Sequence, residues 1–180
     1  MAKRSEVLEA VGAERAAHAA AARAGVEVAE LSSLDHLRAA ADLFVEVWGV
    51  RADLGPISPD MLRAFAHSGN YVAGARAGSA LVGASVAFLA NAGSGYKLHS
   101  HITGVTAAGL SKGVGFALKI HQRAWAIDRG LPVVSWTFDP LVRRNAYFNL
   151  TKLGATANRF LVNFYGEMAD SLNAGDESDR

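Results

Sequence analysis

The sequence predicts an α/β fold in which helices flank a mixed, mostly antiparallel β-sheet, and three observations lead to this prediction. Residues 71–90 form two strand-like stretches separated only by a tight turn near Gly78, which indicates an antiparallel hairpin. A helical pattern lies between the apolar stretches at 97–106 and 131–138, and such a crossover joins parallel neighbours. After an N-terminal helical segment, the expected elements follow in the order β-α-α-β-β-β-α-β-α-β, so helices should flank a single mixed sheet.

The first element is an alanine-rich helix. Residues 5–24 have a strong helix propensity, because Ala, Glu and Arg dominate them. Their apolar face is weak, since it consists of Val7, Leu8 and Val11. We therefore expect residues 1–24 to be a peripheral helical appendage.

A strand and two helices should follow. Residues 26–31 alternate between apolar and polar side chains, as in a half-buried strand. Ser33 is a suitable N-cap for the first helix and Ser58 for the second, which has Pro59 at its first position. Gly69 is a stop signal for that second helix.

The second half of the chain contains the crossover helix, whose broad apolar face should pack on the sheet. Lys119 and Gln122 lie on the opposite, polar face of its pattern. The expected elements are a strand at 97–106, a loop and helix that end at Gly130, a strand at 131–138, a helix at 140–153 and a strand at 158–168. We expect residues 25–170 to form one domain and residues 171–180 to be a polar tail.

The composition restricts the possible functions. The formal net charge is +1, so the chain has no basic surplus for non-specific binding to nucleic acid. The absence of cysteine excludes a disulfide framework, a thiolate nucleophile and Cys-ligated zinc. The longest apolar run, 80–90, is about half the length of a membrane span, and Glu6 and Glu9 interrupt the region where an export signal would be apolar. We expect a cytoplasmic protein without a membrane or nucleic-acid partner.

The stretch GLSKGVGFALKI, residues 109–120, places two glycines directly before a helix. The first amides of a helix lack partners and lie at the positive end of its dipole, so this position favours an anion such as phosphate. A Walker loop is excluded because Val114 follows Gly113, and a dinucleotide fingerprint is disfavoured because Leu118 stands where a third small residue is needed. The glycines also remain compatible with a simple loop before a core helix.

The longer stretch GVTAAGLSKGVGFALKIH resembles the acyl-CoA loop of the GNAT superfamily. The resemblance implies a fold with two splayed central parallel strands and a co-substrate that is acetyl-CoA or another acyl-CoA. It also implies that amides of the loop and helix bind the pyrophosphate, and that the preceding strand donates backbone hydrogen bonds. Leu110 replaces the family's Arg or Gln, so Lys112 would supply the positive charge. The implied binding residues are Val105, Thr106, Lys112, Gly113, Val114, Gly115, Phe116, Ala117 and Asn145.

Two histidines are the first candidates for proton transfer. His99 and His101 are two residues apart on a strand, so their side chains share a face. Either can accept a proton near neutral pH, and His101 is favoured because it is nearer the expected splay, beside a bulge expected at Gly104. The alternative interpretation is that both histidines are half-buried, hydrogen-bonded structural residues. Without a third ligand nearby, they do not predict a metal site.

Asp139 and Tyr147 complete the candidate catalytic set with His101. Asp139 ends the second splaying strand, where its carboxylate can hold a substrate ammonium or relay a proton; its alternative role is to cap the next helix. The family's usual tyrosine acid corresponds to Leu150, so Tyr147 or Asn145 is left to contact the cofactor or protonate the thiolate.

The stretches HITGV, WTFDPL and RNAYFNLTKLGA are similar to a bacterial GNAT subgroup associated with N-acylation of amino acids. Its members usually continue with another strand beyond the residues matching Arg180. The strand at 158–168 should therefore be an exposed edge unless the N-terminal segment, or a second subunit in a homodimer, covers it.

These features predict an acyl-CoA-dependent N-acyltransferase. It would move an acetyl, succinyl or similar acyl group to the amine of a small molecule or amino acid by direct transfer. A non-catalytic acyl-CoA-binding or assembly module with a degenerate active site is the alternative, and another phosphate-ligand enzyme is a third interpretation.

Overall fold

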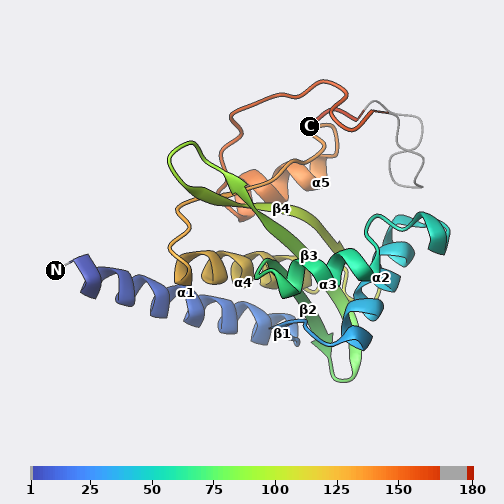
Figure 1. Cartoon of the computed structure of the whole chain (residues 1–180), viewed down its shortest axis with the longest axis horizontal. Coiled ribbons are helices and arrows are strands. Elements are labelled where there is room, and N and C mark those ends of the chain that lie inside the picture. Colours follow the sequence, from blue (N-terminus) through green and yellow to red (C-terminus); the bar gives the residue numbers. More distant parts are fainter. Residues whose placement is uncertain (1, 167–177) are drawn as a thin grey trace.

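The computed structural model describes residues 2–166 and 178–180, and within them the predicted α/β fold is confirmed (Figure 1). The described strands form one curled five-stranded sheet in the order β1-β2-β3-β4-β5. Neighbouring strands are antiparallel except for β4 and β5, which are parallel. The strands are β1 (Glu27–Glu30), β2 (Tyr71–Ala77), β3 (Ala80–Asn91), β4 (Tyr96–Val105) and β5 (Val134–Ser135).

Helices α2 (Leu34–Trp48) and α3 (Pro59–His67) cover one face of the sheet, with a 3₁₀ turn at Ala52–Leu54 between them. Both predicted N-caps are confirmed. The Ser33 hydroxyl accepts a hydrogen bond from the His36 amide at 3.3 Å, and the Ser58 hydroxyl accepts one from the Met61 amide at 3.2 Å. These bonds satisfy first-turn amides and fix where each helix begins.

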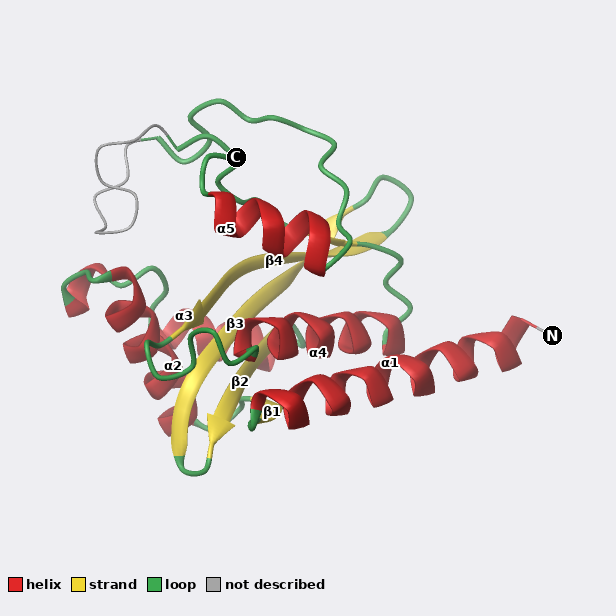
Figure 2. Ribbon diagram, turned by 180° about the vertical axis from the view of Figure 1, so that it is seen from behind, coloured by secondary structure: helices red, strands yellow, loops and turns green. Residues whose placement is uncertain are grey.

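Helices α4 (Val114–Asp128) and α1 (Ala2–Ala24) lie on the opposite face, with α1 alongside α4 (Figure 2). The expected apolar face of α1 is wrong, because Val7, Leu8 and Val11 are exposed. Small side chains are buried instead, and they allow close helix approach. They are Ala13, Ala17, Ala20 and Ala24. The division of the chain at residues 24 and 170 stays a prediction.

The parallel strands β4 and β5 separate after a short contact. Only Leu98 with Val134 and His99 with Ser135 form pairs between them, so the strand expected at 131–138 is much shorter than predicted. Among the described residues no further pair joins these two strands, so the rest of β4 is open on the side that faces away from β3, where the predicted splay lies. The splaying strands are not both central as expected, because β5 is an edge strand of the described sheet.

The bulge in β4 lies at His101 and not at Gly104, where the sequence analysis expects it. The register with β3 shifts between Val86 and Ala87 and skips His101, whereas Gly104 pairs regularly with Ala84. Gly104 serves packing instead, because a Cβ there would lie 3.0 Å from the ring of Trp48.

The helix expected at 140–153 forms as α5 (Arg143–Ala146) followed by a π-helical turn, η2 (Tyr147–Lys152). The strand expected at 158–168 is wrong over its described part, because residues 158–166 form turns and irregular chain. Leu161 exchanges backbone hydrogen bonds of 2.7 and 2.9 Å with Arg180, so this segment pairs with the chain end and not with the sheet.

The expected homodimer stays a prediction, and most of the polar tail, residues 171–177, lies outside the described residues. No helix in the described part of the chain has the length and apolar character needed to cross a membrane.

Candidate active site

The N-terminus of α4 presents backbone amides without side-chain caps. Gly113 is the N-cap residue and has φ +85°, a left-handed conformation that favours glycine. The first helical hydrogen bond runs from the Ala117 amide to the Gly113 carbonyl at 2.9 Å. The amides of Val114, Gly115 and Phe116 therefore form a first turn that is free to meet an anion.

Gly115 leaves this turn open. Its φ is not positive, and a Cβ at this position would have Val105 Cγ2 as its nearest neighbour at 3.7 Å, an ordinary contact. Gly109 differs, because a Cβ there would lie 2.8 Å from Val105 Cγ1 and 3.0 Å from the Val82 carbonyl oxygen. Packing thus accounts for Gly109 but not for Gly115, whose missing side chain lets a ligand approach the helix backbone.

Two of the implied amide donors are already used within the protein. The Thr106 amide donates to the Val82 carbonyl at 3.0 Å, so its expected role as a cofactor donor is wrong, and Ala117 is excluded by its bond to Gly113. Backbone groups alternate along a strand, so the Val105 amide points away from β3 toward the open edge of β4. Lys112 is exposed in the adjacent loop.

The two histidines of β4 share a face, as predicted, and both contact Phe88. The ring centroids of His99 and His101 lie 5.1 and 5.8 Å from that of Phe88, which itself contacts Phe65 of α3. Desolvation lowers the pKa of His101. The pKa of His99 is also lowered, first by burial and then by the positive charges of His101, Lys97 and Lys119. Both imidazoles are therefore neutral at pH 7 and can accept a proton.

Asp139 and Tyr147 are not joined to the histidines by any hydrogen bond or ring contact among the described residues. An Asp139 carboxylate oxygen accepts a hydrogen bond from the Leu141 amide at 2.8 Å and closes a turn before α5. Asp139 therefore caps this turn and not the helix itself, whose N-cap residue is Val142. Tyr147 is 54% exposed. The carbonyl of the half-buried Asn145 accepts a hydrogen bond from the Asn149 side chain at 2.9 Å.

No protein-family model matches the chain, and no curated protein sequence is significantly similar to it. Its structure is similar to that of an aminoglycoside acetyltransferase from an uncultured soil metagenomic sample in complex with sisomicin, at 17% identity and a TM-score of 0.68, covering 80% of this chain and 97% of that one. An aminoglycoside N-acetyltransferase, AAC(6')-Iy, in complex with CoA is similar at 13% identity and a TM-score of 0.57, covering 74% and 90%. The chain has the GNAT fold. A transcriptional regulator from Bacillus halodurans is similar as well, at 21% identity and a TM-score of 0.59, covering 74% and 95%.

Within this GNAT fold, a lysine that the sequence analysis places on the solvent side lies at the base of the splay. The Lys119 ammonium donates a hydrogen bond to the Ser100 hydroxyl at 2.7 Å and lies 4.8 Å from the centre of the Trp136 ring. Desolvation lowers the pKa of Lys119 to about 7. Its expected position on the polar face of the helix is therefore wrong.

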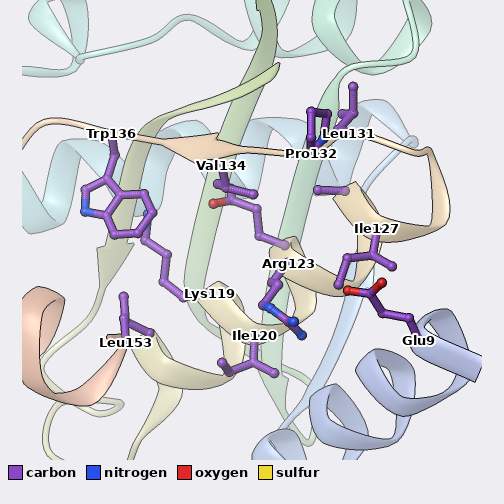
Figure 3. A pocket seen from close by; sticks show the side chains of 12 residues that line it. Glu9, Lys119, Ile120, Arg123, Ile127, Leu131, Pro132, Val134, Trp136 and Leu153 are labelled. Carbon is purple, nitrogen blue, oxygen red and sulfur yellow. The ribbon is translucent and has the colours of Figure 1, made fainter. Parts of the chain in front are cut away.

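Lys119 also lines a pocket of about 280 Å³ between α4, residues 131–136 and Leu153 (Figure 3). Trp136 is held in its wall by a hydrogen bond from its indole N–H to the Asn149 side-chain oxygen at 2.8 Å. Sequence reasoning missed this pocket. The one signal available in the sequence was Asn149, a polar residue inside the helical pattern at 140–153, because asparagine within a helix needs a hydrogen-bond partner for its side chain.

Proposed function

We propose that the protein is an acyl-CoA-dependent N-acyltransferase that transfers an acyl group directly to the amine of a small molecule or amino acid. The observation that carries this proposal is the open first turn of α4, which lies beside the free edge of β4. An amide cradle and a strand edge in this arrangement suit a ligand with a diphosphate followed by an extended, amide-containing arm.

Each described group then has a role in binding or proton transfer. The amides of Val114, Gly115 and Phe116 bind the pyrophosphate of CoA, with Lys112 adding positive charge. The Val105 amide hydrogen-bonds the arm and so orients the thioester. His101 accepts the proton of the attacking amine, directly or through a water molecule, when the new N–C bond forms and the C–S bond breaks.

The remaining sequence-based candidates act on the substrate amine or on the cofactor. Asp139 attracts the substrate ammonium, and Tyr147 or Asn145 contacts the cofactor or protonates the leaving thiolate. Since Tyr147 is largely exposed, its role requires the bound cofactor to cover it.

Calorimetric titration with CoA tests the cradle. Gly115→Glu should abolish binding, because its side chain fills the approach to the amides and repels phosphate, whereas Gly115→Ala should weaken binding less. Thermal melting of both variants controls for folding. Unchanged CoA affinity in a folded Gly115→Glu variant would contradict the proposal.

Thiol release from acetyl-, propionyl- and succinyl-CoA tests the reaction with a panel of amines and amino acids. Aminoglycosides belong in this panel because one structural neighbour was crystallised with sisomicin. Amine-dependent thiol release supports the transferase, and its absence with every pair counts against catalysis.

A non-catalytic acyl-CoA-binding module is the second candidate function. Leu150, 43% exposed, stands in the place of the tyrosine acid expected from the resemblance. Tight CoA binding without turnover would select this module over the enzyme.

A further inference from the structure

We propose that the preferred donors are acyl-CoA thioesters whose acyl group ends in a carboxylate, and that Lys119 binds this carboxylate at the base of the splay between β4 and β5. The inference rests on the proposed function and adds a donor class to it. Four-carbon and five-carbon dicarboxylic acids, joined to CoA through one carboxyl, represent this class.

The position of Lys119 carries the first step. His99 and Ser135 form the last pair between the two strands. The next residue of each strand, Ser100 and Trp136, contacts the Lys119 ammonium. Lys119 therefore spans the apex of the splay on the α4 side. A thioester that enters from the N-terminus of α4 along β4 directs its acyl group toward this apex.

The pocket around Lys119 has unused hydrogen-bonding capacity. Gln122 is fully buried and lines the same pocket, and its side-chain nitrogen donates to the Ser85 hydroxyl at 3.3 Å. Its Oε1 has no hydrogen-bond partner among the described residues. An unpaired buried acceptor is costly, so it indicates a donor from a ligand or water in the pocket. A water molecule that bridges a ligand carboxylate and Gln122 satisfies both groups.

The charges around the pocket also suit an anion. The titratable side chains that line it with Lys119 are Glu9 from α1 and Arg123 from α4. His99 interacts electrostatically with Lys119 from the other face of β4. Val134, Trp136 and Leu153 bring no charge from the opposite wall. A carboxylate at the end of the acyl group forms an ion pair with the Lys119 ammonium and so compensates for the water that this ammonium has lost. The methyl group of an acetyl donor gives no such compensation.

The protonation of Lys119 gives a separate signature. Burial places its pKa near 7, so the free protein loses this charge as the pH rises above neutrality. A carboxylate beside the amine raises the pKa again, so binding at about pH 8 takes up protons. Binding of a neutral acyl group does not.

The experiment is calorimetric titration with CoA, acetyl-CoA and succinyl-CoA, using the full chain, Lys119→Met and Arg15→Met. Arg15→Met is the matched control because it removes one positive charge from the exposed side of α1. The wild type should bind succinyl-CoA about tenfold more tightly than acetyl-CoA, and Lys119→Met should remove this difference while retaining affinity for CoA. Titrations of the wild type in buffers of different ionisation enthalpy should show proton uptake with succinyl-CoA only.

Equal affinity of the wild type for both thioesters, or absence of the differential proton uptake, would overturn the inference even if Lys119→Met did not fold. An intact-mass increase that maps an acyl group to Lys119 would also overturn it, because the amine would then be an acceptor. If CoA itself does not bind, the proposed function fails and the donor preference fails with it. If CoA binds without discrimination between the thioesters, only the donor preference fails.

Discussion

At the scale of single residues, His101 combines exposure to solvent with a hydrophobic neighbour. Burial lowers the pKa of the imidazole, and the ring of Phe88 packs against one side of it. The bulge leaves the backbone position of His101 without a partner on β3. A neutral imidazole with an open side is suited to remove a proton from an amine.

His101→Gln should lower kcat by about 100-fold or more, the usual contribution of a general base. Because the pKa of His101 is below its ordinary value of about 6.5, the wild-type rate should already be on its plateau at pH 7 and fall in acid. The variant should lose this acid limb. Measurement of kcat as a function of pH checks the prediction, and His99→Gln is the control that should keep the acid limb. An unchanged acid limb in His101→Gln would mean that another residue is the general base.

His121 illustrates a structural histidine. Its Nδ1 lies 2.9 Å from the hydroxyl of Tyr71, a fully buried residue of β2, and burial lowers the pKa of His121. The position of His121 at the edge of the apolar face of α4 is typical of a structural residue, and burial together with the hydrogen bond to Tyr71 keeps its imidazole neutral within the fold.

The three lowered histidine pKa values predict how stability depends on pH. As the pH is lowered, histidines in the unfolded chain take up protons at about pH 6.5. In the folded protein His99, His101 and His121 take them up only at a lower pH. The free energy of unfolding should therefore decrease as the pH falls below about 6.5. Urea unfolding at neutral and mildly acidic pH measures it, and His121→Gln should reduce the slope. Stability that stays constant over this range would contradict the burial of these rings.

At the scale of elements, the start of α4 depends on one backbone conformation. Gly113 has φ +85°, whereas a Cβ there would meet only Ala24 at 3.9 Å. Replacement by alanine is therefore limited by the backbone and not by space.

Gly113→Ala should destabilise the protein by roughly 1–2 kcal/mol, the cost of a left-handed conformation for an L-residue. Gly12→Ala is the matched control, because Gly12 lies inside α1 with open space around it. That change should stabilise by about 0.5–1 kcal/mol. Denaturant unfolding compares the two variants, and effects of the same sign would show that φ at Gly113 is not the determinant.

The sequence predicted the local features of the elements better than their partners. The caps at Ser33 and Ser58 were predictable because each hydroxyl bonds an amide three residues ahead. The ends of β5 were not, since strand length is set by pairing with a distant strand. Lys119 was misplaced because periodicity counts lysine as polar, although its long side chain reaches Ser100 beneath Trp136. The amide cradle was predictable, but the use of the Thr106 amide by Val82 depends on sheet register.

At the scale of the whole molecule, the two faces of the sheet are covered differently. Helices α2 and α3 pack large apolar side chains on one face, whereas α4 packs on the other and is itself covered by the alanine side of α1 (Figure 2). Small side chains at a helix interface leave no room for larger ones, so the position of α1 depends on them.

Ala17→Gln should destabilise the protein by about 1–3 kcal/mol, because Ala17 is only 4% exposed and a longer polar side chain overpacks the interface. Val11→Gln, on the exposed side of the same helix, should change stability by less than about 0.5 kcal/mol. Thermal unfolding of the two variants measures the contrast. A neutral Ala17→Gln would mean that α1 does not pack on α4 in solution.

The alternation of side chains along β4 has a consequence for the order of events in a reaction of the proposed kind. Ser100 faces α4 and Lys119, while His101, the next residue, faces Phe88 on the side of α3. The acyl-CoA can then approach from the α4 side of the strand while the acceptor amine approaches its thioester carbonyl from the side of His101. Both substrates can therefore be bound at the same time. The kinetic scheme that matches this geometry is a ternary complex, with intersecting and not parallel double-reciprocal lines.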